Sequence, residues 1–211
     1  MNMNKYFAVF GLPGSLVLTG LMSLLALVLA VCFPSPARWL CFAAMLLSSV
    51  GDIFLMHLPA IEKNLPNYFV YGAASFMIAH VLYALCYLRL IRGSGAAVLN
   101  PGAALMAAIA LAVAVYFVVT ARGLGKLDQL PLILVYIAMI ALDCTMMFSY
   151  AWSQGLRNPL AILAAVGAVS FFVSDLIIGL GMVMGVRRYD HLIWWYYPIG
   201  QILMILGVGK G

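Results

Sequence analysis

The chain has 211 residues, of which 66% are hydrophobic and only 8% are charged, and its formal net charge is +5. A soluble domain carries about 25% charged residues, so this chain cannot cover a water-facing surface of normal size, and lipid is its main solvent. The positive charges stand mostly near the ends of apolar segments, where Lys and Arg meet lipid headgroups, and give no support to nucleic-acid binding.

Apolar segments predict an all-α fold, a polytopic helix bundle that forms a single transmembrane domain over residues 1–211. A span needs about 20 apolar residues, and the chain supplies seven such segments, with an eighth span possible. They cover residues 15–33, 37–56, 67–91, 99–121, 130–152, 159–185 and 191–209. We therefore expect an integral multi-pass membrane protein, placed in the cell membrane if the source is bacterial.

Two Asn-Pro pairs mark expected helix starts. Asn100 precedes Pro101, and Asn158 precedes Pro159. Asparagine is a favoured N-cap, and proline suits the first helical position because its missing N–H is not needed there. The pairs predict that helices begin at Pro101 and Pro159.

Cysteine and histidine spacing does not indicate a metal site. The four cysteines stand singly in apolar segments without a CxxC pair, so neither a zinc site nor a disulfide framework is predicted. A zinc-dependent membrane amidase would need several histidine or carboxylate ligands. The chain has only His57, His80 and His191, two of them at span edges, without HxxxH or HExxH spacing. We expect no metal and no cofactor.

A few polar side chains lie inside the predicted spans: Asp52, His80, Asp143, Asp175 and Gln201. An Asp at a helix centre costs about 2.5–3.5 kcal/mol on insertion scales, so such residues face a partner, a cavity or water, and their default interpretation is functional. The alternative is a structural hydrogen bond between helices, worth about 0.6 kcal/mol on average.

Positions along the spans predict that these groups meet. Face A denotes the membrane face on which the first predicted span begins. At 1.5 Å per residue, Asp52, Asp175 and His80 lie roughly 6, 15 and 20 Å below face A. Asp143 lies at a depth similar to that of His80. We expect the first three groups to converge on one cavity that opens to face A.

Helical spacing gives the polar residues aromatic neighbours. Tyr83 lies on the same face of its span as His80, Tyr136 shares a face with Asp143, and Tyr197 lies one turn before Gln201 in the last span. An aromatic stripe alone is ordinary packing, but beside a buried histidine it is typical of an acyl-chain pocket. Small residues predict close helix contacts: Gly51, Gly72, Ser75, Ala79, Gly167, Ser170 and Ser174.

Four short motifs follow one another over residues 40–209. They are SVGD at 49–52, SFMIAHVLY at 75–83, FFVSD at 171–175 and YYPIGQ at 196–201. In this order they resemble the YhhN family, whose eukaryotic members are lysoplasmalogenases. The resemblance implies hydrolysis of the vinyl ether bond of a lysophospholipid substrate, the lysoplasmalogen, to a fatty aldehyde and a glycerophospho-alcohol. It also implies that Asp52 and Asp175 are the acidic pair needed for activity.

The chain departs from the family pattern in two respects. Many members have eight spans, with an additional helix before the GD motif, whereas seven are counted here. Asp143 matches no acidic residue of the family pattern, and its role stays open.

Two carboxyls suit the chemistry that the resemblance implies. A vinyl ether cleaves in acid when its β-carbon is protonated, and water then captures the oxocarbenium ion. A protonated and an ionised carboxyl in unequal surroundings supply the proton and a stabilising charge, as in glycoside hydrolysis. We expect Asp175 to be the acid and Asp52 the stabilising carboxylate or base, with the reverse assignment left open.

The remaining candidate residues would support the pair. His80 is a candidate catalytic residue that orients a carboxylate or the water. Tyr83, Tyr197 and Gln201 are candidate substrate-binding residues; Tyr197 and Gln201 would bond the glycerol or ether oxygen. The only partners expected are the lysophospholipid and membrane lipid.

Two functions of other classes stay open. Buried Asp and His residues are standard parts of proton- or ion-coupled transporters, although neither an inverted repeat nor paired Gly/Pro-broken helices are visible in the sequence. A structural membrane protein is the third interpretation. In that case, substitutions at Asp52 and Asp175 would lower stability without affecting any turnover.

Overall fold

The protein is a bundle of long helices, seen in a computed structural model that describes residues 8–9, 12–56, 58–127 and 130–209. The predicted all-α class is confirmed. The helices are α1 (Gly14–Cys32), α2 (Pro36–Leu55), α3 (Pro59–Asn64), α4 (Tyr68–Gly93), α5 (Pro101–Gly123), α6 (Leu130–Ser153), α7 (Pro159–Met184) and α8 (Asp190–Gly207). Two strands of two residues each, β1 (Ala8–Val9) and β2 (Leu12–Pro13), pair antiparallel before α1.

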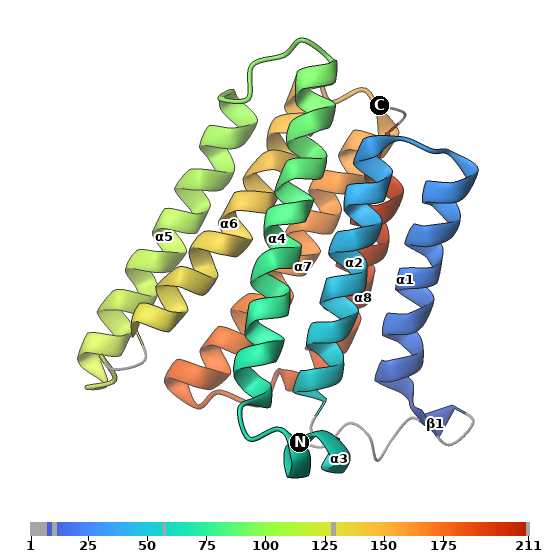
Figure 1. Cartoon of the computed structure of the whole chain (residues 1–211). Helices are drawn as coiled ribbons and strands as arrows, with labels where there is room; N and C mark the ends of the chain where they lie inside the picture. The colour runs from blue at the N-terminus through green and yellow to red at the C-terminus, as the bar shows by residue number, and fades with distance from the viewer. Residues whose placement is uncertain (1–7, 10–11, 57, 128–129, 210–211) are drawn as a thin grey trace.

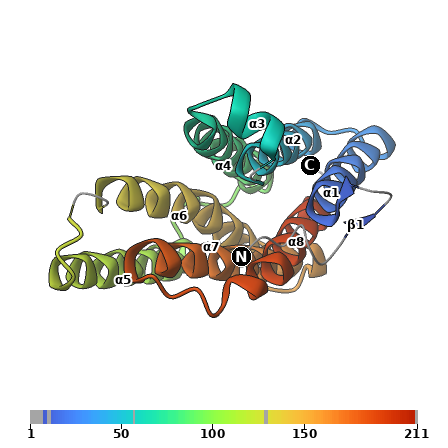
Figure 2. The same cartoon turned by 90° about the horizontal axis from the view of Figure 1, so that it is seen from below.

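The long helices run up and down along one direction, with α1 at one edge of the bundle and α5 at the other (Figures 1 and 2). The most extensive contacts join α7 to α8, α2 to α4, and α5 to α6. Contacts of α6 with α4 and with α7 link these pairs. Face A is the lower end in Figure 1, where α2 and α7 end and α4 and α8 begin.

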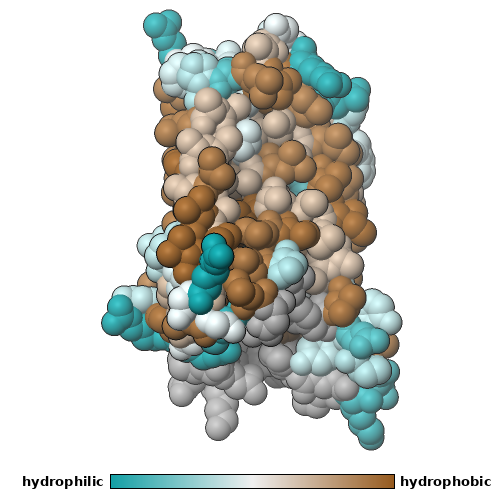
Figure 3. Space-filling view, turned by 90° about the vertical axis from the view of Figure 1, so that its left-hand side faces the viewer, coloured by the Kyte–Doolittle hydropathy of each residue, from teal (hydrophilic) through white to brown (hydrophobic). Residues whose placement is uncertain are grey.

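Six helices of the described chain are long and apolar enough to cross a membrane: α1, α2, α4, α5, α6 and α7. On the α5 side, a broad hydrophobic belt lies between hydrophilic ends (Figure 3). The protein is therefore an integral multi-pass membrane protein. The seventh predicted span corresponds to α8, which carries Asp190, His191 and Gln201 and is not one of the six. The additional helix α3 has only six residues, far below the length of a span.

Both predicted helix starts are confirmed. The Asn100 side chain accepts a hydrogen bond from the Ala103 N–H, and the Asn158 side chain accepts one from the Leu160 N–H. In each case proline is the first helical residue. Ser35 caps α2 in the same way, through the backbone N–H of Arg38.

Glycines let the main helix pairs pack backbone against backbone. A Cβ added at Gly167, Gly200 or Gly207 would lie 2.7 or 2.8 Å from a backbone nitrogen of the opposing helix, so α7 and α8 cannot be this close with larger residues. Between α2 and α4, a Cβ at Gly51 would lie 3.2 Å from the Gly72 carbonyl oxygen. The close contacts predicted at Gly51, Gly72 and Gly167 are confirmed.

The substitution Gly200→Ala is expected to destabilise the protein, because its methyl group would lie 2.8 Å from the Phe171 backbone nitrogen. Overpacking of this kind costs about 1–3 kcal/mol. The thermal midpoint in detergent measures the effect. Gly20→Ala is the matched control, since a Cβ at that helical glycine has nothing within 4 Å. Equal midpoints for the two variants would contradict the packing argument.

Candidate functional site

A cavity of about 300 Å³ lies in the face-A half of the bundle, between α2, α4, α5, α6, α7 and α8. Its wall is almost entirely apolar. The exceptions include two carboxyls, Asp52 and Asp175, and two phenol hydroxyls, those of Tyr136 and Tyr197. Met182, in the last turn of α7, is 39% exposed and marks the rim. An apolar wall with a few polar groups is the usual form of a small-molecule site.

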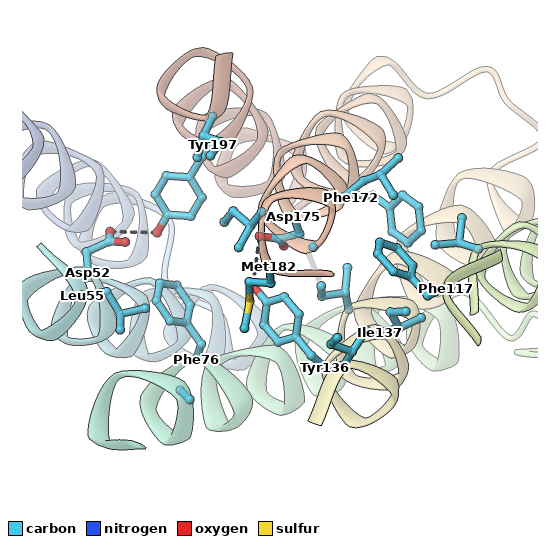
Figure 4. Close-up of a pocket in the computed structure, with 18 of the residues that line it drawn as sticks. Asp52, Leu55, Phe76, Phe117, Tyr136, Ile137, Phe172, Asp175, Met182 and Tyr197 are labelled. Carbon is cyan, nitrogen blue, oxygen red and sulfur yellow. Dashed lines mark hydrogen bonds between the residues drawn. The ribbon is translucent and has the colours of Figure 1, made fainter. Parts of the chain in front are cut away.

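Asp52 stands in the last turn of α2 and is held from two neighbouring helices. Its Oδ2 accepts hydrogen bonds from the hydroxyl of Thr19 on α1, at 2.6 Å, and from the hydroxyl of Tyr197 on α8, at 2.8 Å. Two O–H donors on one oxygen suit an ionised carboxylate, which can only accept. The Tyr197 bond is drawn in Figure 4.

Asp175, on α7, has a different environment. Its Oδ1 accepts a hydrogen bond from the Tyr136 hydroxyl on α6 at 3.0 Å. Its Oδ2 is buried and has no partner among the described residues. In Figure 4, Asp52 and Tyr197 lie at one end of the cavity and Asp175 lies near its middle. The two carboxyls thus share a cavity wall, as predicted, but differ in their hydrogen bonds.

His80 lies behind this wall rather than on it. Its Nδ1 is 3.0 Å from Oδ2 of Asp143, whose Oδ1 accepts a hydrogen bond from the Cys144 N–H at 2.8 Å. The imidazole packs edge-on against Tyr136, with ring centroids 6.4 Å apart. Its Nε2 has no partner among the described residues. Asp143, whose role the sequence left open, is thus the buried partner of His80.

Two of the candidate substrate-binding residues bond to each other. The Tyr83 hydroxyl donates to the side-chain carbonyl of Gln201 at 2.6 Å, and both residues are fully buried. Neither belongs to the cavity wall, whereas Tyr197 does. One turn further along both helices, the Tyr87 hydroxyl donates to the Met204 carbonyl at 2.6 Å.

Thr19 and Tyr136 had no predicted role, although each bonds a cavity carboxyl. Thr19 was hard to find because a hydroxyl inside a span often bonds its own helix. The available signal was the pair Thr19 and Ser23, one turn apart in an otherwise apolar segment. The Ser23 hydroxyl lies 2.7 Å from that of Ser49 on α2, so the pair faces the Asp52 helix.

In the part of the chain that the structure describes, no group of three or more His, Cys, Asp or Glu residues is placed to hold a metal ion. His57, one of the three histidines considered above, lies outside the described residues.

A family model covers nearly the whole helix bundle. Residues 15–208 match the model of the YhhN family. The chain belongs to the YhhN family. The resemblance drawn from the four motifs is therefore confirmed, and both cavity carboxyls of this YhhN protein lie inside the matched region.

Two curated relatives of this YhhN protein are each named Lysoplasmalogenase, one from Mycobacterium bovis and one from Mycobacterium tuberculosis. Each is 34% identical over 173 residues, which cover 81% of this chain and 60% of the relative. The chain thus spans less than two thirds of the length of these relatives. No solved structure matches the chain.

Proposed function

We propose that this protein is a membrane hydrolase that cleaves the vinyl ether bond of lysoplasmalogens to a fatty aldehyde and a glycerophospho-alcohol. The observation that carries the proposal is the pair of carboxyls with unequal hydrogen bonds on the wall of an apolar cavity inside the membrane domain. The name shared by the two mycobacterial relatives supports the same reaction.

The reaction needs a proton donor and a negative group close together. Protonation of the β-carbon converts the vinyl ether to an oxocarbenium ion. Water adds to this ion and loses a proton, giving a hemiacetal, which then separates into aldehyde and alcohol. A neutral acid and a carboxylate on one site supply both requirements, as they do for the similar cation of glycoside hydrolysis.

In the proposed mechanism Asp175 is the acid. Tyr136 occupies only one of its oxygens, so the other, which has no partner among the described residues, can carry the proton toward the substrate. Asp52 is the ionised member because two hydroxyl groups donate to it. The negative charge of Asp52 stabilises the cation, and the carboxylate takes the proton of the attacking water.

The other candidate residues act around this pair. Tyr197 lines the cavity and donates its one hydroxyl proton to Asp52, so its oxygen can accept a hydrogen bond from a glycerol hydroxyl of the substrate. His80 acts through Tyr136, against which it packs, and is a positioning residue. Tyr83 and Gln201 bond each other away from the wall, so we propose that they hold α4 to α8 rather than contact the substrate.

The proposal predicts aldehyde release from a defined lysoplasmalogen by detergent-purified protein. A lysophospholipid with a saturated ether chain of the same length is the matched control, because it lacks the double bond that accepts the proton. We expect aldehyde from the vinyl ether only. Folded, monodisperse protein that releases no aldehyde would contradict the proposal and favour another lipid substrate or proton-coupled transport.

A further inference from the structure

The polar groups of the cavity lie toward one end, among apolar side chains such as Leu55 and Phe76, and the other end is apolar. Asp52 and Tyr197 lie at one end, Asp175 lies near the middle, and the rings of Phe117 and Phe172 lie at the opposite end (Figure 4). The wall beyond Asp175 comes from hydrocarbon side chains of α5, α6 and α7. Under the proposed function, a reacting vinyl ether between the carboxyls would direct its alkyl chain toward Phe117.

Phe117 closes this apolar end. It lines the cavity and also belongs to a second, smaller hydrophobic core, which is formed by residues of α5, α6 and α7. The side chain of Phe117 is only 2% exposed, so the ring itself, and not surrounding lipid, bounds the cavity at this end. Ala121 and Val183, both fully buried, belong to the same core.

The position of the Phe117 ring depends on Gly179 of α7. A Cβ added at Gly179 would lie 2.9 Å from Cζ at the tip of the ring, too close for both to stay in place. Both residues line the cavity. The absence of a side chain at Gly179 thus leaves the space that the ring occupies at the end of the cavity.

We propose that Phe117, seated against Gly179, sets the longest alkyl chain that the cavity accepts. This inference rests on the proposed function for the identity of the substrate. A methylene group takes roughly the 30 Å³ of a water molecule, so the cavity of about 300 Å³ holds on the order of ten of them.

The selection is steric. A chain that leaves a bilayer or micelle was already in hydrocarbon, so it gains little hydrophobic free energy in the cavity. Substrates with chains shorter than the limit therefore differ little from one another in kcat/KM. A chain that is one or two methylenes too long meets the ring, and a mismatch of this size changes kcat/KM about 10-fold or more.

Two substitutions move the end wall in opposite directions. Phe117→Leu removes ring atoms and lengthens the cavity, so the longest accepted chain becomes longer by about two carbons, and kcat/KM for the first chain above the parent limit rises about tenfold. Gly179→Ala adds a methyl group to the cavity wall, 2.9 Å from the tip of the ring, and takes space from this end of the cavity, so the limit becomes shorter. The matched controls are Phe42→Leu, a partly buried core position outside the wall, and Gly20→Ala.

The experiment uses lysoplasmalogens whose chain lengthens two carbons at a time, at fixed mole fraction in detergent, with aldehyde release as the readout. The second measurement is thermal stabilisation by saturated ether analogues of the same lengths, because a bound ligand raises the midpoint without turnover. We expect both readouts to show the same limit, displaced in the two cavity variants and unchanged in the two controls.

The outcomes separate the two proposals. Turnover by the parent with identical chain-length profiles in all four variants would overturn the role of Phe117 and leave the proposed function intact. Absence of turnover with every vinyl ether would contradict the proposed function. The stabilisation series then decides the role of Phe117 alone: a displaced limit supports it, and an undisplaced limit overturns it.

Discussion

Asp52→Asn and Asp175→Asn are each expected to lower kcat for aldehyde release by about 10²–10⁴-fold, the usual contribution of a positioned acid or base. An amide of the same size keeps the shape of the cavity but can neither carry the acidic proton nor supply the negative charge. Because the substrate chain would still fit the apolar wall, KM is expected to change much less than kcat.

The control for this pair is Asp190→Asn, the same chemical change at the start of α8, where the carboxyl pairs with the exposed Arg187 on the protein surface. Its turnover is expected to stay close to that of the parent. Thermal midpoints show that every variant compared is folded. Normal turnover by well-folded Asp52→Asn and Asp175→Asn variants would contradict the carboxylate mechanism.

Asp143→Asn is expected to lower kcat by up to about 10²-fold, with little effect on KM. Asp143 fixes the His80 ring through a 3.0 Å contact, and His80 packs against the tyrosine that bonds Asp175. Loss of that support displaces the acid, and a misplacement of about 1 Å can reduce a rate 10²-fold. The steady-state constants of the purified variant test this split between kcat and KM.

The double variant Asp143→Asn/His80→Leu makes the test specific. If Asp143 acts through His80, the double variant and His80→Leu alone have the same kcat, so the losses are not additive. His80→Leu alone is expected to be the less stable protein, because it leaves a buried carboxylate unpaired, which costs about 3–5 kcal/mol. Additive losses in kcat would show that the two residues act independently.

Much of the fold could be predicted from the sequence because the signals are local. Apolar length alone placed the helices within about two residues, a usual uncertainty for helix ends, and Asn-Pro pairs marked two of the starts. The short helix α3 was missed, because its six residues lie in the link between the predicted spans 37–56 and 67–91. The helix α8 was predicted as a span, although it is not one of the six helices of the described chain that are long and apolar enough to cross a membrane.

For the site residues, the sequence predicted only their depth below face A. Distance along each span correctly placed Asp52 and Asp175 on one cavity. The same reasoning wrongly placed His80 on that cavity and did not predict its pairing with Asp143, because the pairing depends on how α4 and α6 are rotated about their own axes. In helices that are apolar on nearly every face, the sequence carries little information on rotation.

Three side-chain hydrogen bonds join α8 to α2 and α4 at successive turns: Tyr197 to Asp52, Tyr83 to Gln201, and Tyr87 to the Met204 carbonyl. The three bonds follow one another along α8, and the bond between Tyr197 and Asp52 lies nearest face A. Any separation of α8 from α2 and α4 that starts at that face would break the three hydrogen bonds in this order. The first bond to open would release Asp52 from Tyr197 while the Thr19 hydroxyl still donates to it, so loss of this bond and widening of the cavity would be a single event.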